Sequence, residues 1–388
     1  MTVQTLPAGV ERPLFDSDHE QFRDTVRKFI EREILPHHDR WEEQGYVDRS
    51  AWLAAGEAGL LCVTMPEEYG GAGVDRRYSA ILIEEFARSG ATGPGFSLHS
   101  EIVANYLLRY ANEEQKRRWL PPMARGERIG AIAMTEPGAG SDLQAVRTTA
   151  RRDGDYYVLN GSKTYITNGY NSDLVIVVVK TDPEKGAKGT SLIVVEEGTP
   201  GFTKGRRLKK LGLKAQDTSE LFFDDVRVPA SNLLGREGEG FIYLMQELPW
   251  ERMMIALRAV ATAEAAIDWT LDFVRNRKAF GKTVFDFQTT RFKLAELRTK
   301  ARVGRSFIDD CLGRVLENKL DPTTAAMAKL WSTDMQCEVI DECLQLHGGS
   351  GFMLEYPIAR AYADARVDRI SAGSNHILKL IIGRDLLK

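Results

Sequence analysis

The chain has 388 residues, a length that favours two or three domains. It carries 52 Lys and Arg against 55 Asp and Glu, and this formal net charge of −3 excludes a general nucleic-acid binder, which needs a basic surface. No apolar run approaches the roughly 18 residues of a transmembrane helix, and the four cysteines form no CxxC pair of the kind that holds zinc or performs dithiol redox chemistry.

The amino terminus reads MTVQTLPAGVERPLF. A secretory signal needs a positively charged stretch followed by an apolar core, and this segment has neither. The sequence therefore predicts a protein of a reducing, cytoplasmic compartment.

The first third of the chain has the apolar spacing of helices. Between residues 17 and 35, Phe22, Val26 and Ile30 recur at helical intervals with polar residues between them. Pro36 is predicted to end this helix, because its ring clashes with a preceding helical turn. Further helices are predicted near residues 50–58, 78–89, 97–110 and 113–124. We expect an N-terminal helical domain over residues 1–128.

The middle of the chain has the spacing and the residue types of strands. Runs rich in β-branched and aromatic residues are predicted as strands over 146–152, 156–159, 162–167, 174–180, 191–196 and 220–228. Asp153-Gly154 and Asn160-Gly161 are typical hairpin turns, because both residues of such a pair tolerate positive φ. The pattern predicts an antiparallel β domain over residues 129–235.

Helical spacing returns after Gly240. The runs near 250–278, 286–316, 322–346 and 374–387 are long enough for a bundle of four or five antiparallel helices over residues 236–388. Helices, then strands, then helices predict an α+β protein and not a doubly wound sheet, in which strands and helices alternate.

Four glycine-rich or polar segments are candidate ligand sites, at residues 134–142, 163–169, 345–352 and 371–376. Taken singly, each indicates little. The first is typical of a loop between strands. His347 favours a capping or packing role over metal binding, because no further ligands stand at metal spacing. Ser374 or Asn375 is predicted to cap the last helix.

Taken together, the four segments occur in the order and at the separations of the acyl-CoA dehydrogenase family, which this chain resembles over nearly its whole length. Residues 209–218 and 247–252 are most similar to the long-chain branch, and residues 277–282 match a further family motif. The resemblance implies the family fold, with an N-terminal helical domain, a middle β domain and a C-terminal bundle. It implies FAD-dependent oxidation of an acyl-CoA thioester to the trans-2-enoyl-CoA, in fatty-acid β-oxidation.

The resemblance also implies partners and cofactor contacts. An electron-transferring flavoprotein is the expected acceptor, and the expected assembly is a homotetramer. By motif position, residues 165–167 cover the flavin ring, while Arg277, Phe280, Gln288 and residues 345–349 reach the FAD of a neighbouring subunit. The predicted FAD contacts are Ile132, Met134, Thr135, Gly140, Ser141, Tyr165, Ile166, Thr167, Arg277, Phe280, Gln288, Gln345, Leu346, His347, Gly348, Gly349, Ser374, Asn375 and His376. The predicted substrate contacts are Ser141, Lys188, Arg252, Ala372 and Gly373. No metal is expected.

The catalytic base needs a separate argument. Many family members carry it in an EGT-type motif near the carboxyl terminus, where this chain has Ala372. The long-chain and isovaleryl branches carry it on a helix that opens the bundle, and the matching residue is Glu251. Glu251 continues an apolar stripe with Ile255 and Ala259, so it is expected to lose hydration and to have a raised pKa. The alternative is an ordinary glutamate near a helix start. Ala372 retains the backbone N–H that polarises the thioester carbonyl in the family.

Other departures from the family pattern are Tyr165 for a common Trp, His376 for Glu or Gln, and Ser371 for a common Tyr. Trp250, next to the predicted base, is a candidate to shorten or bend the acyl channel. Two alternative functions stay open at this point. One is an acyl-CoA oxidase that uses the same base and delivers electrons to oxygen. The other is a non-catalytic flavin or acyl-CoA binding protein.

Overall fold

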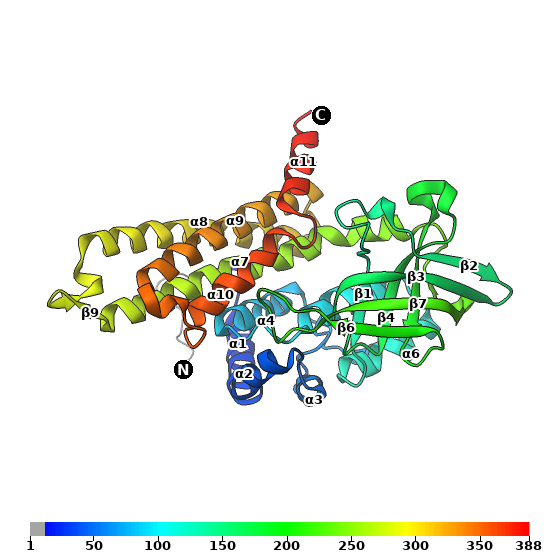
Figure 1. The fold of residues 1–388 in the computed structure, drawn as a ribbon, viewed down its shortest axis with the longest axis horizontal. Coiled ribbons are helices and arrows are strands. Elements are labelled where there is room, and N and C mark those ends of the chain that lie inside the picture. Colours follow the sequence, from blue (N-terminus) through cyan, green and yellow to red (C-terminus); the bar gives the residue numbers. More distant parts are fainter. Residues whose placement is uncertain (1–11, 388) are drawn as a thin grey trace.

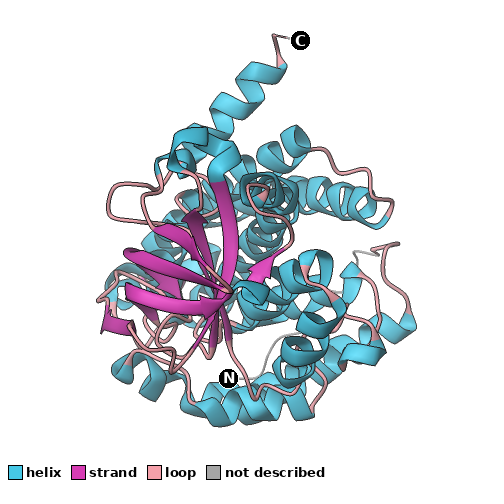
Figure 2. Ribbon diagram, turned by 90° about the vertical axis from the view of Figure 1, so that its right-hand side faces the viewer, coloured by secondary structure: helices cyan, strands magenta, loops and turns pink. Residues whose placement is uncertain are grey.

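The computed structural model describes residues 12–387, and in Figure 1 a sheet lies at one end of the molecule and three long helices extend from it to the other. Figure 2 shows the sheet facing the viewer with the long helices behind it. Within residues 12–387, no helix has both the length and the apolar character needed to cross a membrane. The prediction of a cytoplasmic location rests on residues 1–15, most of which lie outside the described residues.

The N-terminal part is helical, as predicted. Its helices are α1 (Ser17–Phe29), α2 (Leu35–Gln44), α3 (Arg49–Glu57), α4 (Arg76–Ser89), α5 (Ala104–Tyr110) and α6 (Glu113–Ala124), with π-helical turns at Ile30–Ile34 and Leu98–Val103. The prediction that Pro36 ends a helix is wrong. Pro36 lies in the first turn of α2, where a missing N–H costs no helical hydrogen bond.

The middle part forms one eight-stranded sheet. Its strands are β1 (Gly130–Ala133), β2 (Thr149–Asp153), β3 (Tyr156–Thr167), β4 (Leu174–Lys180), β5 (Thr190–Glu196), β6 (Phe202–Arg207), β7 (Thr218–Pro229) and β8 (Leu233–Leu234). Their order is β6-β7-β3-β2-β4-β5-β8, and β1 also pairs with β4. All seven residues of β4 are buried, which fits its apolar sequence.

Two features of the sheet differ from the prediction. The sheet is mixed and not purely antiparallel, because β1 runs parallel to β4. Asn160-Gly161 does not form a turn but lies at a bulge inside the single long strand β3. A Cβ at Gly161 would lie 2.5 Å from the Thr148 hydroxyl, so close packing and not chain reversal requires this glycine. Asp153-Gly154 does connect β2 to β3 as a hairpin.

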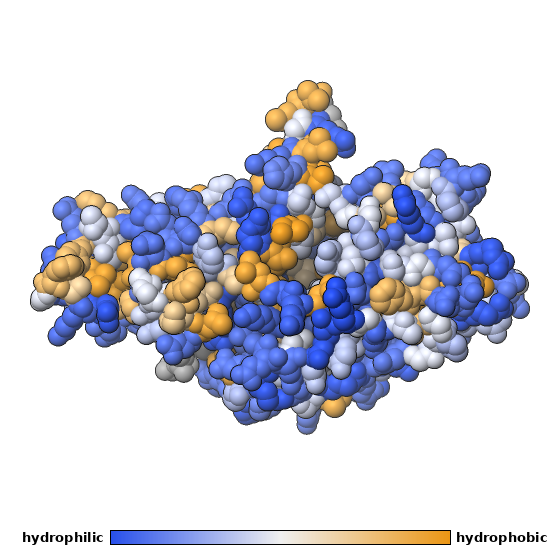
Figure 3. Space-filling model, viewed as in Figure 1, coloured by the Kyte–Doolittle hydropathy of each residue, from blue (hydrophilic) through white to orange (hydrophobic). Residues whose placement is uncertain are grey.

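The C-terminal part contains α7 (Gly240–Asn276), α8 (Gln288–Leu316), α9 (Pro322–His347), α10 (Pro357–Ala365) and α11 (Asn375–Asp385), with a small hairpin of β9 (Lys278–Ala279) and β10 (Lys282–Thr283). Short 3-10 turns occur at Glu67–Tyr69, Leu143–Ala145, Pro183–Gly189, Ala230–Asn232, Val284–Asp286, Gly348–Phe352 and Arg366–Arg369. The expectation that the last helix lies along the bundle is wrong, because α11 contacts α9 and then projects from the body (Figure 1). Apolar side chains cover much of the projecting helix in Figure 3, and Leu386 is 80% exposed.

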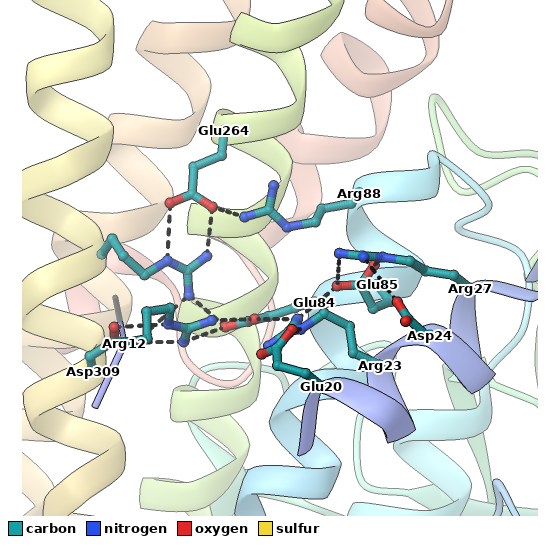
Figure 4. Close-up of polar contacts among 11 residues, drawn as sticks. Arg12, Glu20, Arg23, Asp24, Arg27, Glu84, Glu85, Arg88, Glu264 and Asp309 are labelled. Carbon is teal, nitrogen blue, oxygen red and sulfur yellow. Dashed lines mark hydrogen bonds and ion pairs between the residues drawn. The ribbon is translucent and has the colours of Figure 1, made fainter. Parts of the chain in front are cut away.

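Helices α4 and α7 lie side by side and run in the same direction. Arg76 of α4 lies over the Trp250 ring of α7 at 4.2 Å, and further along Arg88 of α4 pairs with Glu264 of α7. Between these two contacts, Glu84 of α4 is the centre of a buried ion-pair network (Figure 4). The network therefore attaches the N-terminal helices to the bundle.

Glu84 is completely buried and accepts two hydrogen bonds from Arg12, at 2.7 and 2.9 Å, and a third from Arg305 of α8. Arg305 also donates twice to Glu264, at 3.0 and 2.9 Å. Arg23 of α1 bridges Glu84 and Glu85 (Figure 4). Burial alone would raise the pKa of Glu84, but the three surrounding guanidinium groups outweigh it and hold that pKa well below its ordinary value.

We predict that Glu84→Gln lowers the free energy of unfolding by about 3–5 kcal/mol, since the substitution leaves buried arginines without their shared counter-charge. Because the folded-state pKa is depressed, this stabilisation is fully present above the unfolded pKa of a glutamate and is lost as pH falls through the lower folded value. Urea unfolding of both proteins at neutral and acidic pH measures the effect. Glu317→Gln, at an exposed pair with Lys319, is the matched control and should change little. Equal losses from both substitutions would contradict the prediction.

Candidate active site

A cavity of about 280 Å³ lies where the three parts of the chain meet. One wall is α4 with residues 91–102, the opposite wall is α7, and the segment 367–372 closes a third side. The sheet contributes Ile132 from β1 and Thr167 from the end of β3. The cavity thus brings together Glu251, Ala372, Ile132 and Thr167, four predicted site residues that are far apart in the sequence.

Glu251 is buried in the wall of this cavity, two residues after Pro249 in α7. Burial raises the pKa of its carboxyl to about 7, and the neighbouring Glu247 acts in the same direction. A hydrogen bond from the Tyr106 hydroxyl to Glu251 Oε1, at 3.3 Å, and the charge of Arg252 oppose this rise. A carboxyl with such a pKa can exchange a proton near neutral pH.

Glu247, one turn before Glu251, is also buried but is fully engaged. It pairs with Arg109 at 2.8 Å and accepts hydrogen bonds from Asn105 and Tyr110, each at 2.6 Å. Glu247 is not among the residues that line the cavity. Of the two glutamates, only Glu251 combines access to the cavity with weak compensation of its charge.

The segment 371–375 has a strained and well-anchored backbone. Ala372 has φ +49° and Gly373 φ +90°, both in the left-handed region, which is unfavourable for alanine. The Ala372 carbonyl accepts from Arg252 at 3.4 Å, and the Gly373 carbonyl accepts from Lys329 at 3.0 Å. Within residues 12–387 the Ala372 N–H donates to no other group. This N–H therefore has no acceptor among the described residues, and Ala372 lines the cavity.

A buried ion pair on the inner side of the loop that follows β1 holds this loop in place. Lys163 of β3 contacts Glu136 at 2.8 Å, and Glu136 also accepts from the backbone N–H groups of Arg147 and Thr148 at 2.7 and 2.9 Å. Because Glu136 faces inward, its neighbours in residues 137–141 lie mostly at the surface.

The surface beside this loop fits a flavin. Tyr165 is 69% exposed and has φ +60°, so an aromatic ring stands clear of the sheet. Ile166, next to it, points into the core, while Thr167 lines the cavity edge. An exposed aromatic plane, small residues and hydroxyl groups next to a cavity are the chemistry that holds a planar, polar heterocycle.

A second group of predicted FAD contacts lies far from this cavity. Arg277, Phe280 and Gln288 are exposed near the β9–β10 hairpin, at the opposite end of α7 (Figure 1), and residues 345–349 end α9 close by. The His347 Nδ1–H donates to the Cys343 carbonyl at 2.8 Å, and the ring stacks on Phe273 with ring centres 4.4 Å apart. This is a packing histidine, as its spacing predicts.

Several other predicted residues lie outside the cavity. Lys188 and His376 are exposed, and neither lines the cavity. Asn375 is buried with its side chain bonded to Lys329 at 2.9 Å, and Ser374 stands at the N-cap of α11 without a capping hydrogen bond. Trp250 packs under the Arg76 guanidinium and is not among the residues that line the cavity, so the cavity gives no support to the suggestion that its ring bends the acyl channel. Met134, Thr135, Gly140, Ser141 and Gly373 also lie beyond the lining residues.

The sequence did not indicate Tyr106 or Arg258. Tyr106 is 145 positions from Glu251, and no local pattern marks it as the donor to that carboxylate. Arg258 lines the cavity two turns beyond Glu251 on the same face of α7. The seven-residue spacing between them is visible in the sequence and could have indicated that the two side chains share a face.

The fold is helical–β–helical, and a buried carboxylate and an unbonded backbone N–H belong to residues that line one cavity, a combination that suits an enzyme acting on a carbonyl compound. Comparison with known proteins identifies the family. Residues 16–127, 131–226 and 238–387 match the N-terminal, middle and C-terminal domain models of acyl-CoA dehydrogenase. The chain therefore belongs to the acyl-CoA dehydrogenase family.

Individual relatives agree with this assignment. The chain is 54% identical to the mitochondrial long-chain specific acyl-CoA dehydrogenase of Sus scrofa over 381 residues, which are 98% of this chain and 88% of that protein. It is similar to an acyl-CoA dehydrogenase structure from Geobacillus kaustophilus, with TM-score 0.95, 49% identity and coverage of 97% and 100%. It is also similar to a glutaryl-CoA dehydrogenase of Mycobacterium smegmatis in complex with FADH2, with TM-score 0.90, 31% identity and coverage of 96% and 95%.

The family, the fold class and the enzyme class predicted from the sequence are thereby confirmed. The protein is an acyl-CoA dehydrogenase, an oxidoreductase of a flavoprotein family that works in fatty-acid β-oxidation. The alternative of a non-catalytic flavin or acyl-CoA binding protein is therefore not favoured.

We predict that Tyr106→Phe moves the acidic limb of the pH profile of kcat/KM to higher pH, because it removes the hydrogen bond that lowers the pKa of Glu251. Activity at about pH 6 should fall several-fold, while activity at about pH 9 should stay the same. Steady-state turnover with an artificial electron acceptor measures the profile. Tyr157→Phe removes a partly buried hydrogen bond from Tyr157 of β3 to the exposed Glu237 and should leave the limb in place. A uniform loss at every pH would contradict a role through the pKa.

Proposed function

We propose that Glu251 is the base that removes the α proton of an acyl-CoA thioester. The observation that carries the proposal is that Glu251, with a pKa raised to about 7, and Ala372, with a free N–H, line one cavity. A thioester whose carbonyl oxygen accepts from that N–H has its α carbon next to the carbonyl and therefore near the carboxylate. The hydrogen bond stabilises the negative charge that develops on the oxygen as the proton leaves.

Each group of the proposed site performs one step of the reaction. The α C–H bond breaks and its proton goes to the Glu251 carboxylate, while the electron pair forms the new double bond. The hydrogen on the β carbon leaves as hydride. When bound, FAD supplies the acceptor for that hydride. The buried wall excludes water, so Glu251 keeps the proton and the product is the trans-2-enoyl thioester.

We propose FAD as the cofactor, held by the predicted contacts from Ile132 to Thr167 on the sheet. The exposed Tyr165 ring and the anchored loop after β1 support this. Helix α7 continues for 25 residues after Glu251 before the chain reaches Arg277 and its neighbours. A helical segment of that length spans about 38 Å. One flavin cannot contact both groups of one chain, which supports the proposal that a second copy completes the cofactor site.

The assembly that we propose is a homo-oligomer, with the tetramer as its expected form. Its support is the exposed apolar surface of the chain, since Phe280 is 94% exposed at the hairpin and Leu386 80% exposed on α11. We also propose domain boundaries after residues 128 and 235, which agree with the gaps between the three matched family models.

The electron acceptor and the location remain predictions. An electron-transferring flavoprotein is the proposed acceptor, and oxygen would make the protein an acyl-CoA oxidase. A cytoplasmic location is the prediction from the sequence, while the pig relative is named as mitochondrial.

We predict that Glu251→Gln slows reduction of the flavin by acyl-CoA by a factor of about 10²–10⁴, since general bases contribute rate accelerations of that size. The variant should keep its yellow colour and should still bind acyl-CoA, because glutamine has nearly the same shape. Anaerobic stopped-flow bleaching of the flavin measures the rate.

Glu338→Gln, at an exposed glutamate of α9, is the control for a change of charge and should bleach at the normal rate. Undiminished bleaching in Glu251→Gln would place the base elsewhere. A folded protein that stays colourless with added FAD would overturn the flavin proposal, and one peroxide per turnover without another acceptor would identify an oxidase.

A further inference from the structure

The cavity that contains Glu251 does not end in an apolar wall. Beyond it lies a second cavity of about 20 Å³, between α7, α9 and α10. The two cavities share four lining residues, Ala87, Thr92, Leu213 and Arg258. These four residues therefore form the partition between them.

Arg258 is the charged element of this partition. Among the described residues that line the larger cavity, only Glu251 and Arg258 carry charge, and the remaining wall is mostly aliphatic or aromatic. Arg258 pairs with Asp368, whose side chain is only 3% exposed, while the Arg258 side chain is 32% exposed amid an otherwise buried stretch of α7. Arg258 thus combines a partly exposed side chain that lines the cavity with a buried partner.

Several polar side chains line the small cavity behind Arg258, although most of its surface is apolar. Three buried side-chain atoms without a hydrogen-bond partner in residues 12–387 belong to residues that line it, namely Arg258 Nε, Gln336 Oε1 and Arg360 Nε. In the same wall, Thr92 donates to Asp364 at 2.6 Å. A volume of this size holds about one water molecule, and the three atoms are polar groups packed around the cavity, themselves inaccessible to water.

We propose that Arg258, held by Asp368, is the polar end wall that sets the acyl-chain length which this enzyme binds best. The inference rests on the proposed function, since it takes the larger cavity as the acyl site. Glu251 marks the level of the α carbon. Arg258 is seven residues further along α7, or about 10.5 Å. The cavity follows this face, because Glu251, Met254, Ile255 and Arg258 all line it.

The distance converts into a number of carbons. An extended chain advances about 1.25 Å per carbon, given a C–C bond of about 1.5 Å. About eight carbons beyond the α carbon reach Arg258, so an acyl chain of about ten carbons fills the cavity. Longer chains must bend or leave their ends in contact with the guanidinium group. Arg258 is thereby a specificity-determining residue of this chain.

The test is a chain-length series on the holoenzyme. The affinity for the trans-2-enoyl-CoA products from 6 to 18 carbons is measured by calorimetry, and kcat/KM is measured for the matching acyl-CoA substrates. In the natural protein we expect affinity to rise about fourfold per carbon to about ten carbons, as for buried methylenes, and then to level off.

In Arg258→Ala/Asp368→Asn, which removes both charges together, the rise should continue for about four more carbons. At 14 carbons the variant should bind at least about tenfold more tightly than the natural protein, while at 8 carbons the two should agree within about threefold. Arg258→Met keeps the volume with an apolar side chain and should also lose the plateau, so the test survives if the double variant does not fold.

The matched control is Arg298→Ala/Asp268→Asn, which removes an Arg–Asp pair between α8 and α7 that borders neither cavity. It should reproduce the natural profile. The proposal is overturned if the natural profile rises unbroken to 16 carbons, or if the plateau stays at the same length in both Arg258 variants. Failure of the proposed function is distinct, because then no acyl-CoA of any length is oxidised, whatever the binding profile.

Discussion

The buried ion pairs around Glu84 are the interaction on which the reactive cavity depends. The cavity is the space between α4 and α7, and the two helices hold their relation through contacts at three levels, from Arg76 over Trp250 to the Glu84 cluster and the Arg88–Glu264 pair. A slip of α4 against α7 would break charged hydrogen bonds that water cannot easily replace. The dry wall opposite Glu251, and with it the raised pKa of that carboxyl, follows from this attachment.

Three buried glutamates show how partners and not burial alone decide chemistry. Glu84 and Glu264 are as inaccessible as Glu251, yet guanidinium groups in direct contact lower the pKa of both. Glu251 has only a long hydrogen bond from Tyr106, and the adjacent Arg252 is directed to the Ala372 carbonyl. The same side chain is therefore a structural anion at two positions and a proton acceptor at the third.

Sequence reasoning found what is encoded locally or by ordered motifs. The apolar stripe through Ile255 predicted the burial of Glu251, and the order of the motifs predicted the fold. Sequence reasoning failed where one residue type is compatible with two different local structures. Pro36 starts a helix as readily as it ends one, and Gly161 serves a close approach where a turn was expected. It also failed where the partner is distant, since neither Tyr106 with Glu251 nor Arg258 with Asp368 leaves a local signature.

Helix α7 also explains how one family fold admits different substrates. The base at Glu251 and the end wall at Arg258 lie on one face of a rigid helix, so the distance between them is fixed by helical geometry and not by a loop. A change at position 258 leaves the base, the Ala372 amide and the sheet surface in place. Resemblance to the long-chain branch, carried by other residues, therefore does not determine the length of the acyl cavity, which this chain sets with an arginine and its buried aspartate.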